Sequence, residues 1–389
     1  MTTTARGALG RVLVIGAGLG GLTLAHGLAR AGIDFRVYEQ ERGVHSRFQG
    51  YRIGLRTEGR EALLACLPER LHALLDAVCG DLTGPGLVLD SQLNELQRGP
   101  GFEPDAIVVD RHVLRHLLLT GLIDHVEFGR RLSGAAELPD GTLRATFTDG
   151  SEAAGDVLVG ADGGNSALRA WLLPHIRLVE SDLCGALGRT TLTDRFAPLV
   201  PGASTMVKGP GSTLMLGPMR FRRPPVEAAA ELAPDVRLPA TSSYLRWVML
   251  VPPNHPMSRP GVAAQDAREV VLDLIAGWHT DLVDLMRAAD PGNSAVGRAM
   301  VTDRPLEPWT AGRMTLLGDA AHLTLASGGN GANTAFRDAE LLCRRLVQAD
   351  RGELEVGAAL EAYQREMLAR GNAAVEHSKE ALGRFLPES

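Results

Sequence analysis

The start of the chain constrains its fold most, because a glycine-rich turn there joins a strand-like segment to a helix-like one. Arg11–Ile15 is an apolar run of strand length, and apolar side chains then recur at helical spacing up to Gly32. Phe35–Glu39 is a second strand candidate. The order strand, turn, helix, strand predicts a βαβ unit and therefore a buried parallel sheet in an α/β fold.

The turn has the spacing G-x-G-x-x-G, supplied by Gly16, Gly18 and Gly21. The first glycine permits the tight turn, the second lets the backbone approach a pyrophosphate, and the third lets the helix pack closely on the strand. The helix that starts near Leu19 offers unpaired N–H groups to an anion. Glu39 ends the second strand about 20 residues later, where a carboxylate accepts from ribose hydroxyls. The segment therefore predicts an adenine dinucleotide site, and the carboxylate favours NAD or FAD over NADP there.

Composition and spacing exclude several other classes of protein. The 389 residues carry 46 acidic and 40 basic side chains, and the net charge of −6 argues against a polycationic nucleic-acid binder. No charge-free apolar run reaches ~18 residues, so no membrane span is expected. His112 and His116 have the spacing of a metal-binding pair, but no third ligand accompanies them, so no metal site is expected. The cysteines show no C-x-x-C and predict reduced thiols in a cytoplasmic protein; they are Cys66, Cys79, Cys184 and Cys343.

The middle of the chain has a different character from its two ends. From about residue 181 to 252, strand candidates alternate with glycine and proline turns, which predicts an antiparallel sheet inserted between the halves of the first domain. Residues 222–239 are rich in proline and alanine and are expected to form a surface loop or lid. Helices are expected over 333–348 and 355–382.

Two later segments resemble motifs of a known family. Residues 156–169 (DVLVGADGGNSALR) run from an apolar strand into an Asp-Gly pair. Residues 313–322 (RMTLLGDAAH) run from another strand into a Gly-Asp pair, and residues 328–333 (GGNGAN) lead into a helix. Together with the first turn, and in this order, these motifs resemble the flavoprotein monooxygenases of the para-hydroxybenzoate hydroxylase fold, the single-component aromatic hydroxylases. The resemblance spans most of the chain.

The resemblance implies a fold as well as a cofactor. We expect an α/β protein with a Rossmann-like FAD-binding domain of the glutathione-reductase type, an inserted antiparallel β-sheet substrate domain and C-terminal helices. The expected boundaries are 1–180 for the first part of the FAD-binding domain, 181–275 for the substrate domain, 276–350 for the second part of the FAD-binding domain and 351–389 for a C-terminal helix.

The resemblance also assigns roles to individual residues. Gly16, Gly18, Leu19, Gly21 and Glu39 would hold the ADP half of FAD. Further cofactor contacts are implied for Arg47, Arg111, Asp162, Gly163, Asp319, Gly331, Ala332 and Asn333. Among these, Arg111 would reach the pyrophosphate and Asp319 a ribityl hydroxyl. The helix that starts at residues 331–333 would face the flavin pyrimidine, where its N-terminus stabilises negative charge.

The implied activity is an NAD(P)H- and O2-consuming monooxygenation, hydroxylation or epoxidation, through a flavin C4a-hydroperoxide. Because the cofactor carries this chemistry, no protein nucleophile is expected, and only Arg52 is assigned to the substrate side. Apolar side chains of the inserted sheet suggest an apolar or aromatic substrate, such as a polyketide; they include Leu183, Leu187, Met206, Leu214, Leu216, Tyr244 and Trp247.

Two alternatives stay open. A flavin-dependent reductase or dehydrogenase is one. A redox-neutral flavoprotein, a cyclase or a ligand-binding protein with structural FAD, is the other, and one departure from the family favours it: Leu323 and Ala326 stand where the family usually has prolines beside the reactive part of the flavin. His322 is expected to be a packed residue rather than a base.

Overall fold

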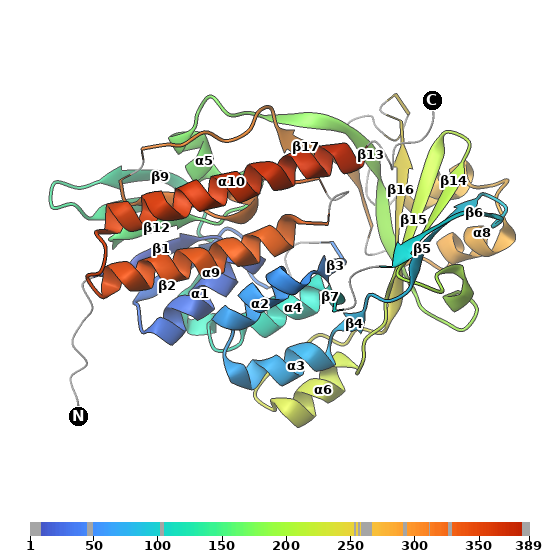
Figure 1. Cartoon of the computed structure of the whole chain (residues 1–389), viewed down its shortest axis with the longest axis horizontal. Coiled ribbons are helices and arrows are strands. Elements are labelled where there is room, and N and C mark those ends of the chain that lie inside the picture. Colours follow the sequence, from blue (N-terminus) through green and yellow to red (C-terminus); the bar gives the residue numbers. More distant parts are fainter. Residues whose placement is uncertain are drawn as a thin grey trace.

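The fold joins an α/β unit to a large, mostly antiparallel sheet, as the computed structural model in Figure 1 shows. The structure describes residues 9–44, 50–101, 105–252, 254–255, 257, 267–290, 294–310, 312–325 and 329–382. The long helix α10 (Val356–Leu382) runs along the α/β unit beside α9 (Gly331–Asp350).

The α/β unit is built on a parallel sheet of five strands in the order β18-β12-β1-β2-β8. Its central strands β1 and β12 are buried along their whole length, which explains why they are uninterrupted apolar runs in the sequence. The strands are β1 (Val12–Ile15), β2 (Phe35–Glu39), β8 (Val126–Phe128), β12 (Val157–Gly160) and β18 (Met314–Leu316). The βαβ start and the parallel sheet predicted from the sequence are confirmed.

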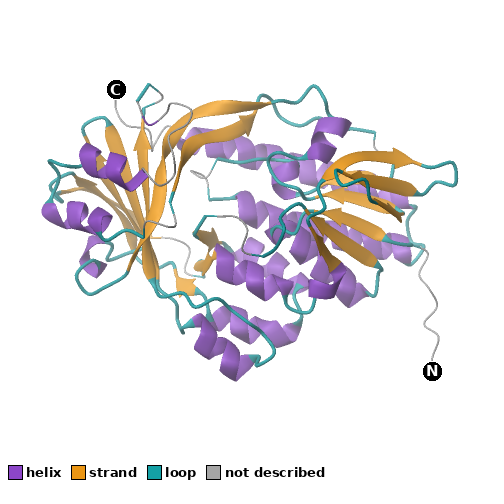
Figure 2. Cartoon of the chain, turned by 180° about the vertical axis from the view of Figure 1, so that it is seen from behind, coloured by secondary structure: helices purple, strands orange, loops and turns teal. Residues whose placement is uncertain are grey.

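Helices and a small sheet complete this unit. The helix α1 (Leu19–Ala31) contacts α9, α2 (Thr57–Cys66) and α4 (Arg111–Leu119). A three-stranded antiparallel sheet, seen beyond the parallel strands in Figure 2, consists of β9 (Leu132–Glu137), β10 (Leu143–Phe147) and β11 (Glu152–Gly155). The short helices are α3 (His72–Ala77) and α5 (Ala167–Leu172).

A seven-stranded sheet forms the second part of the molecule, in the order β17-β13-β16-β15-β14-β5-β6. One face packs on α7 (Ala267–Leu274) and α8 (Thr280–Arg287), and α8 lies on the side away from the α/β unit. The strands are β5 (Pro85–Asp90), β6 (Glu95–Gly101), β13 (Leu178–Thr191), β14 (Ser204–Gly209), β15 (Ser212–Met219), β16 (Tyr244–Val251) and β17 (Ala295–Thr302). The sheet thus extends beyond the expected segment 181–275, because β5 and β6 precede that segment and β17 follows it.

The two parts meet at a second small sheet, with the order β3-β7-β4. It is formed by β3 (Arg52–Leu55), β7 (Ile107–Asp110) and β4 (Gly80–Asp81). Apolar side chains of this sheet and of the large sheet share one cluster, which includes Val108, Met219 and Tyr244.

The expected surface loop at 222–239 is wrong in its central part. Pro225–Leu232 forms the helix α6, which contacts α3 and buries Ala228 and Ala229 in the main core. A proline at the first helical position is favourable, because its missing N–H would have no helical partner there. Three alanines, residues 228–230, stand in the middle of the helix, and alanine has the highest helix propensity.

Candidate functional site

The three glycine motifs converge at the carboxyl ends of adjacent parallel strands. Gly16 follows β1 with φ +109°, and a Cβ atom on it would lie 2.3 Å from the carbonyl oxygen of Ala161, which follows β12. A Cβ on Gly20 would lie 2.6 Å from the Leu317 side chain, which follows β18. Glycine is required at Gly16, where the contact is with backbone and φ is positive, whereas at Gly20 the Leu317 side chain would have to move. Ligands of open α/β sheets bind at this edge.

The N-terminus of α1 is free to receive an anion. Its N-cap is Gly18, no side chain caps it, and no acidic residue lies in its first turn. A Cβ on Gly18 would meet nothing within 4 Å. Leu19, the first helical residue, is buried, so it contributes its backbone rather than its side chain to this surface. Unpaired N–H groups beside open space are what a pyrophosphate requires.

Glu39 lies beside this helix terminus and is 7% exposed. Its Oε2 accepts a hydrogen bond of 2.7 Å from the Ala17 N–H, and its Oε1 accepts one of 2.9 Å from the Glu41 N–H. The carboxylate therefore shapes the glycine turn directly, which the sequence did not indicate. Each oxygen keeps a second lone pair, so the proposed bonds to ribose hydroxyls stay compatible with this geometry.

A buried arginine that sequence reasoning passed over also holds the turn. Arg115, on α4, is 1% exposed. Its Nε donates to the Ala17 carbonyl at 3.1 Å, its Nη1 donates to the Val44 carbonyl at 2.9 Å, and its Nη2 lies 3.9 Å from Glu39. Burial lowers the pKa of Arg115, although the Glu39 charge opposes that shift. Arg111, the predicted pyrophosphate ligand, begins the same helix and donates its backbone N–H to Tyr51 at 2.6 Å.

The second and third motifs are tied together by another arginine. Arg169, on α5, donates to the carbonyls of Gly164 and Ala320, one from each motif. Asp162 accepts from the Ala167 N–H at 2.8 Å and so fixes the turn before α5, and burial raises the pKa of its carboxyl. Gly163 has φ +77°, which explains the glycine after Asp162.

The N-terminus of α9 completes the candidate site. No side chain caps it, and its first turn has no acidic residue. A Cβ on Gly331 would lie 2.7 Å from the Thr324 hydroxyl and 3.6 Å from Oδ1 of Asp319, so the structure brings Asp319 and Gly331 together. Asn333 anchors the helix, since it accepts from the Arg56 N–H at 2.9 Å and donates to the Gly54 carbonyl at 2.9 Å. Ala332, between them, is partly exposed.

Behind the third motif lies a buried charge cluster formed by His322, Asp338 and Arg370. The Nε2 of His322 lies 2.5 Å from Oδ2 of Asp338, and Arg370 donates to Oδ1 of Asp338 at 2.7 Å. Asp338 also accepts from the Gly318 N–H at 3.2 Å, so the cluster fixes the turn that carries Asp319. His322 is 2% exposed, which agrees with its expected role as a packed residue.

The large sheet turns one face toward this site. Tyr244 donates its hydroxyl to Asp110 at 2.8 Å, and Leu250 shares an apolar cluster with Leu325, which follows the third motif. Leu187 and Met206 lie on the same face and are partly exposed. Leu214, Leu216 and Trp247, which were expected to line a pocket, instead pack on α7 and α8 on the opposite face. Successive strand residues point to opposite faces, so one apolar strand cannot place all of its side chains in one pocket.

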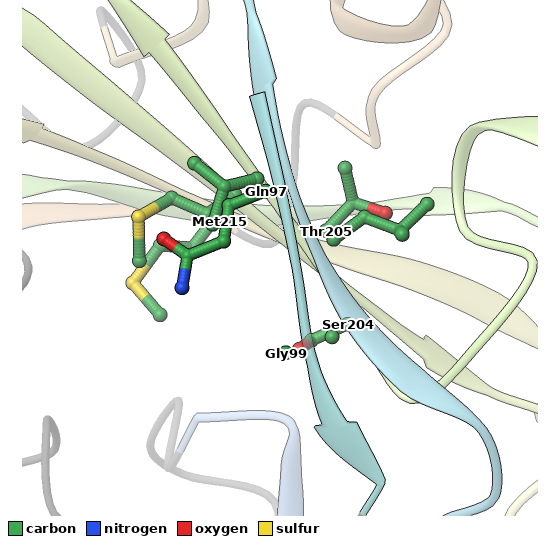
Figure 3. Close-up of a pocket in the computed structure, with 9 residues that line it drawn as sticks. Gln97, Gly99, Ser204, Thr205 and Met215 are labelled. Carbon is green, nitrogen blue, oxygen red and sulfur yellow. The ribbon is translucent and has the colours of Figure 1, made fainter. Parts of the chain in front are cut away.

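A shallow pocket of about 170 Å³ opens on this sheet, between β5, β6, β14 and β15. Figure 3 shows Met215 and Gln97 on one side of the ribbons and Thr205 on the other. Arg52 lies nearby and donates to the carbonyls of Pro218 at 2.9 Å and Ala203 at 3.3 Å. The predicted contact Arg47 and the position of Ala326 lie outside the described residues, whereas Leu323 is described and partly exposed.

Neither a metal centre nor a membrane-spanning helix occurs among the described residues. In the described part of the chain, no group of three or more His, Cys, Asp or Glu side chains is arranged to hold a metal ion. The rings of His112 and His116 contact each other edge to face, with their centres 4.6 Å apart. No helix in the described ranges has both the length and the apolar character needed to cross a membrane.

Glu39→Gln tests the ribose assignment. The substitution keeps the size of the side chain but removes its charge, and its NH2 group can no longer accept the backbone N–H that one of the two oxygens accepts now. We therefore expect FAD affinity to fall about tenfold or more, and a tenfold loss corresponds to ~1.4 kcal/mol. The measurement is titration of the apo-protein with FAD. Asp34→Asn is the matched control, because Asp34 precedes the same strand at its other end and forms an exposed ion pair with Arg11. Equal FAD affinity in wild type and Glu39→Gln would contradict the assignment.

Comparisons with known proteins agree with this geometry. A family model described as "FAD binding domain" matches residues 262–378, and one described as "NAD(P)-binding Rossmann-like domain" matches residues 14–58. The aurachin C monooxygenase/isomerase of Stigmatella aurantiaca is 30% identical over 371 residues, which cover 93% of this chain and 86% of that protein. The dual O-methyltransferase/FAD-dependent monooxygenase CTB3 of Cercospora nicotianae is 28% identical over 87% of this chain, but the chain spans only 42% of its length.

Solved structures show the same fold. A protein of Photorhabdus luminescens, determined as a candidate FAD-containing monooxygenase, has a TM-score of 0.82 and 28% identity, with 96% of this chain and 98% of that chain covered. HpxO of Klebsiella pneumoniae, crystallised with FAD and uric acid, has a TM-score of 0.76 and 23% identity, with 96% of this chain and 87% of that chain covered.

Proposed function

Since the chain belongs to the FAD-dependent monooxygenases, we propose that it consumes NAD(P)H and O2 to insert one oxygen atom into a small organic molecule, by hydroxylation or epoxidation. The substrate we propose is an apolar or aromatic secondary metabolite of the polyketide kind. The observation that carries the proposal is the pair of uncapped helix N-termini, α1 and α9, at one sheet edge.

The names of the relatives support the oxygenation of a small organic molecule. Besides the aurachin C enzyme, an FAD-dependent monooxygenase of Trichoderma harzianum is 27% identical over 95% of this chain. The FAD-dependent urate hydroxylase of Klebsiella pneumoniae, at 27% identity, acts on a small heterocycle. One atom of O2 would enter the product. The other would leave as water, with the two electrons and the hydrogen that NAD(P)H gives up as hydride and one further proton.

The residues present fit FAD, and each would have a distinct task. Gly16, Gly18, Leu19, Gly21 and Glu39 would hold the ADP half, with Arg111, Asp162 and Gly163 near the pyrophosphate. Asp319 would accept from a ribityl hydroxyl, and Gly331, Ala332 and Asn333 would present the α9 N-terminus to the pyrimidine end of the ring system. When bound, FAD supplies electron transfer and oxygen activation.

The protein would contribute orientation, charge stabilisation and exclusion of water. The α9 N-terminus carries partial positive charge, which favours the reduced, anionic cofactor. The face of the large sheet that carries Leu187 and Met206 would cover the reacting end and exclude water, so that reducing equivalents are not lost to side reactions.

The test uses purified protein with its bound cofactor. We expect a flavin absorbance spectrum, oxidation of NAD(P)H and consumption of O2 that a substrate accelerates, and a product 16 mass units heavier, a gain that corresponds to one oxygen atom. A panel of bicyclic phenols and naphthols provides the first substrates. Substrate reduction without O2 would favour the reductase alternative. Bound FAD that NAD(P)H does not reduce would favour the redox-neutral alternative.

A further inference from the structure

Ala17, the residue between the first two glycines of the turn, is held through both of its backbone polar groups. Its N–H donates to Oε2 of Glu39 at 2.7 Å, and its carbonyl accepts from Nε of Arg115 at 3.1 Å. Ala17 and Arg115 are both fully buried, so this carbonyl points into the interior of the protein. Two buried charged side chains therefore fix the peptide planes on either side of Ala17.

The orientation of the Ala17 carbonyl decides where the next N–H points. The peptide bond between Ala17 and Gly18 is trans, and the C=O and N–H of a planar trans peptide point in opposite directions. Because the carbonyl is turned inward to Arg115, the Gly18 N–H is turned away from the interior. Gly18 is partly exposed, its surroundings are open, and no acceptor within the described ranges takes its N–H. The turn thus presents an unpaired donor on its open side.

Arg115 can impose this orientation because the helix that carries it, α4, is fixed near both ends. Asp110 caps its N-terminus, where Oδ1 accepts from the Val113 N–H at 2.8 Å. Near its C-terminus, the Leu118 carbonyl lies 2.8 Å from Nε2 of His26, and since a carbonyl only accepts, the histidine donates. His26 belongs to α1, the helix that follows the glycine turn. The arginine therefore acts from a helix that is tied to the same element as the turn.

An ion pair alone does not explain why this arginine is buried. Its Nη2 comes no closer than 3.9 Å to Glu39 and, in the part of the chain that the structure describes, has no hydrogen-bond partner. Both hydrogen bonds of the guanidinium go to main-chain carbonyls, those of Ala17 and Val44. Burial lowers the pKa of Arg115, which shows that the charged form is disfavoured there. A cation kept inside at such a cost is typical of a functional site.

We infer that Arg115 is a positioning residue for the cofactor: it fixes the Ala17 carbonyl and so directs the Gly18 N–H at the FAD pyrophosphate, without touching FAD itself. This inference rests on the proposed function, which places the pyrophosphate at the N-terminus of α1. A bond from this N–H to a pyrophosphate oxygen is charge-assisted, and a donor that is oriented in advance need not be ordered when the ligand binds. Without the arginine, the peptide is free to rotate and the donor is no longer aimed.

Equilibrium titration of the full-length apo-protein with FAD tests this independently of turnover. We expect Arg115→Met to bind FAD about 10- to 100-fold more weakly than the wild type. In Arg115→Lys a methylene group takes the place of Nε while the positive charge beside Glu39 is kept, so we expect a similar loss. Arg30→Met is the matched control, because Arg30 also donates to two main-chain carbonyls, those of Ala65 and Leu67, but at the opposite end of α1. It should bind FAD as the wild type does.

A double-mutant cycle with Gly18→Val separates positioning from general support of the fold. Gly18→Val alone should already keep the pyrophosphate away from this N–H, so adding Arg115→Met should weaken FAD binding less than about threefold further. If Arg115→Met does not fold, as judged by circular dichroism, Arg115→Lys takes its place in the cycle.

Three results would overturn the inference. The first is FAD affinity at the wild-type level in either Arg115 variant, and the second is a loss that multiplies with that of Gly18→Val, which would assign the arginine to the fold in general. The third is unchanged FAD affinity in Gly18→Val, which would remove the pyrophosphate from this turn. Failure of substrate-dependent O2 consumption alone would count only against the proposed function.

Discussion

Asp338→Ala is expected to lower the free energy of unfolding by about 3–5 kcal/mol, because it leaves the partly buried cation Arg370 without its anion and the buried His322 without its hydrogen-bond partner. The Gly318 N–H loses its acceptor in the same step. The measurement is thermal unfolding of the apo-protein, followed by circular dichroism. The control is Glu340→Gln on the same helix, whose ion pair with Arg344 is largely exposed and should contribute less than about 1 kcal/mol. Similar melting of the two variants would contradict a stabilising cluster.

The same cluster predicts a dependence of stability on pH. Burial alone would lower the pKa of His322, but Asp338 outweighs it and the pKa is raised above 6.5. Burial alone would raise the pKa of Asp338, but His322 and Arg370 hold it below 3.8. The stabilisation from charged His322 is therefore complete below about pH 6.5 and is lost as the pH rises through the raised pKa. The gap in melting temperature between wild type and His322→Gln should be widest near pH 5–6 and narrow at alkaline pH.

Gly18→Val is expected to leave a folded apo-protein that has lost about 100-fold or more in FAD affinity. The backbone at Gly18 is extended, with φ −78°, and its surroundings are open, so a larger side chain fits the fold. It would occupy the space through which the α1 N-terminus approaches a pyrophosphate, and the lost charge-assisted bonds amount to roughly 3 kcal/mol. FAD titration measures the loss, and circular dichroism reports the fold.

Two further glycine-to-valine substitutions serve as controls for Gly18→Val. Gly16→Val should fail to fold, since its Cβ would lie 2.3 Å from Ala161 at a positive φ. Gly134→Val, on β9, adds the same side chain where nothing lies within 4 Å and should change neither property. If Gly18→Val binds FAD as the wild type does, the pyrophosphate does not lie at this helix terminus.

Local backbone demands explain what the sequence predicts well here. A positive φ or a close approach accepts only glycine, so Gly16 and Gly163 mark their turns without reference to the rest of the fold. Contacts between residues that are far apart in the sequence do not restrict the residue type in this way, so the sequence does not reveal them. In the sequence, nothing distinguishes Arg115 from the many surface arginines, yet its side chain is buried and donates to the Ala17 carbonyl. The two partners of Asp338, His322 and Arg370, come from a loop and from another helix.

The second part of the molecule was harder to predict for the same reason. Strand candidates such as Tyr244–Val251 are apolar at nearly every position, so alternation does not reveal which side chains face the site. Whether Leu216 or Met215 lines that face depends on register with β14 and β16. The domain boundaries given above, and the roles of the individual cofactor residues, stay predictions.

The parallel pairing of β5 with β14 has a consequence for how this chain is made. Val88 of β5 pairs with Met206 of β14, so β5 leaves the ribosome long before its partner strand β14 has been synthesised. Non-local parallel pairing is slow. β5 pairs with β6, the next strand in the chain, but its other edge stays open until β14 is made, and an open strand edge is prone to aggregate. The segment between these strands also supplies β7, β8 and β12, so synthesis completes much of the parallel sheet first. A nascent chain stopped before residue 204 would expose the β5 edge, and we expect chaperones to recognise it there.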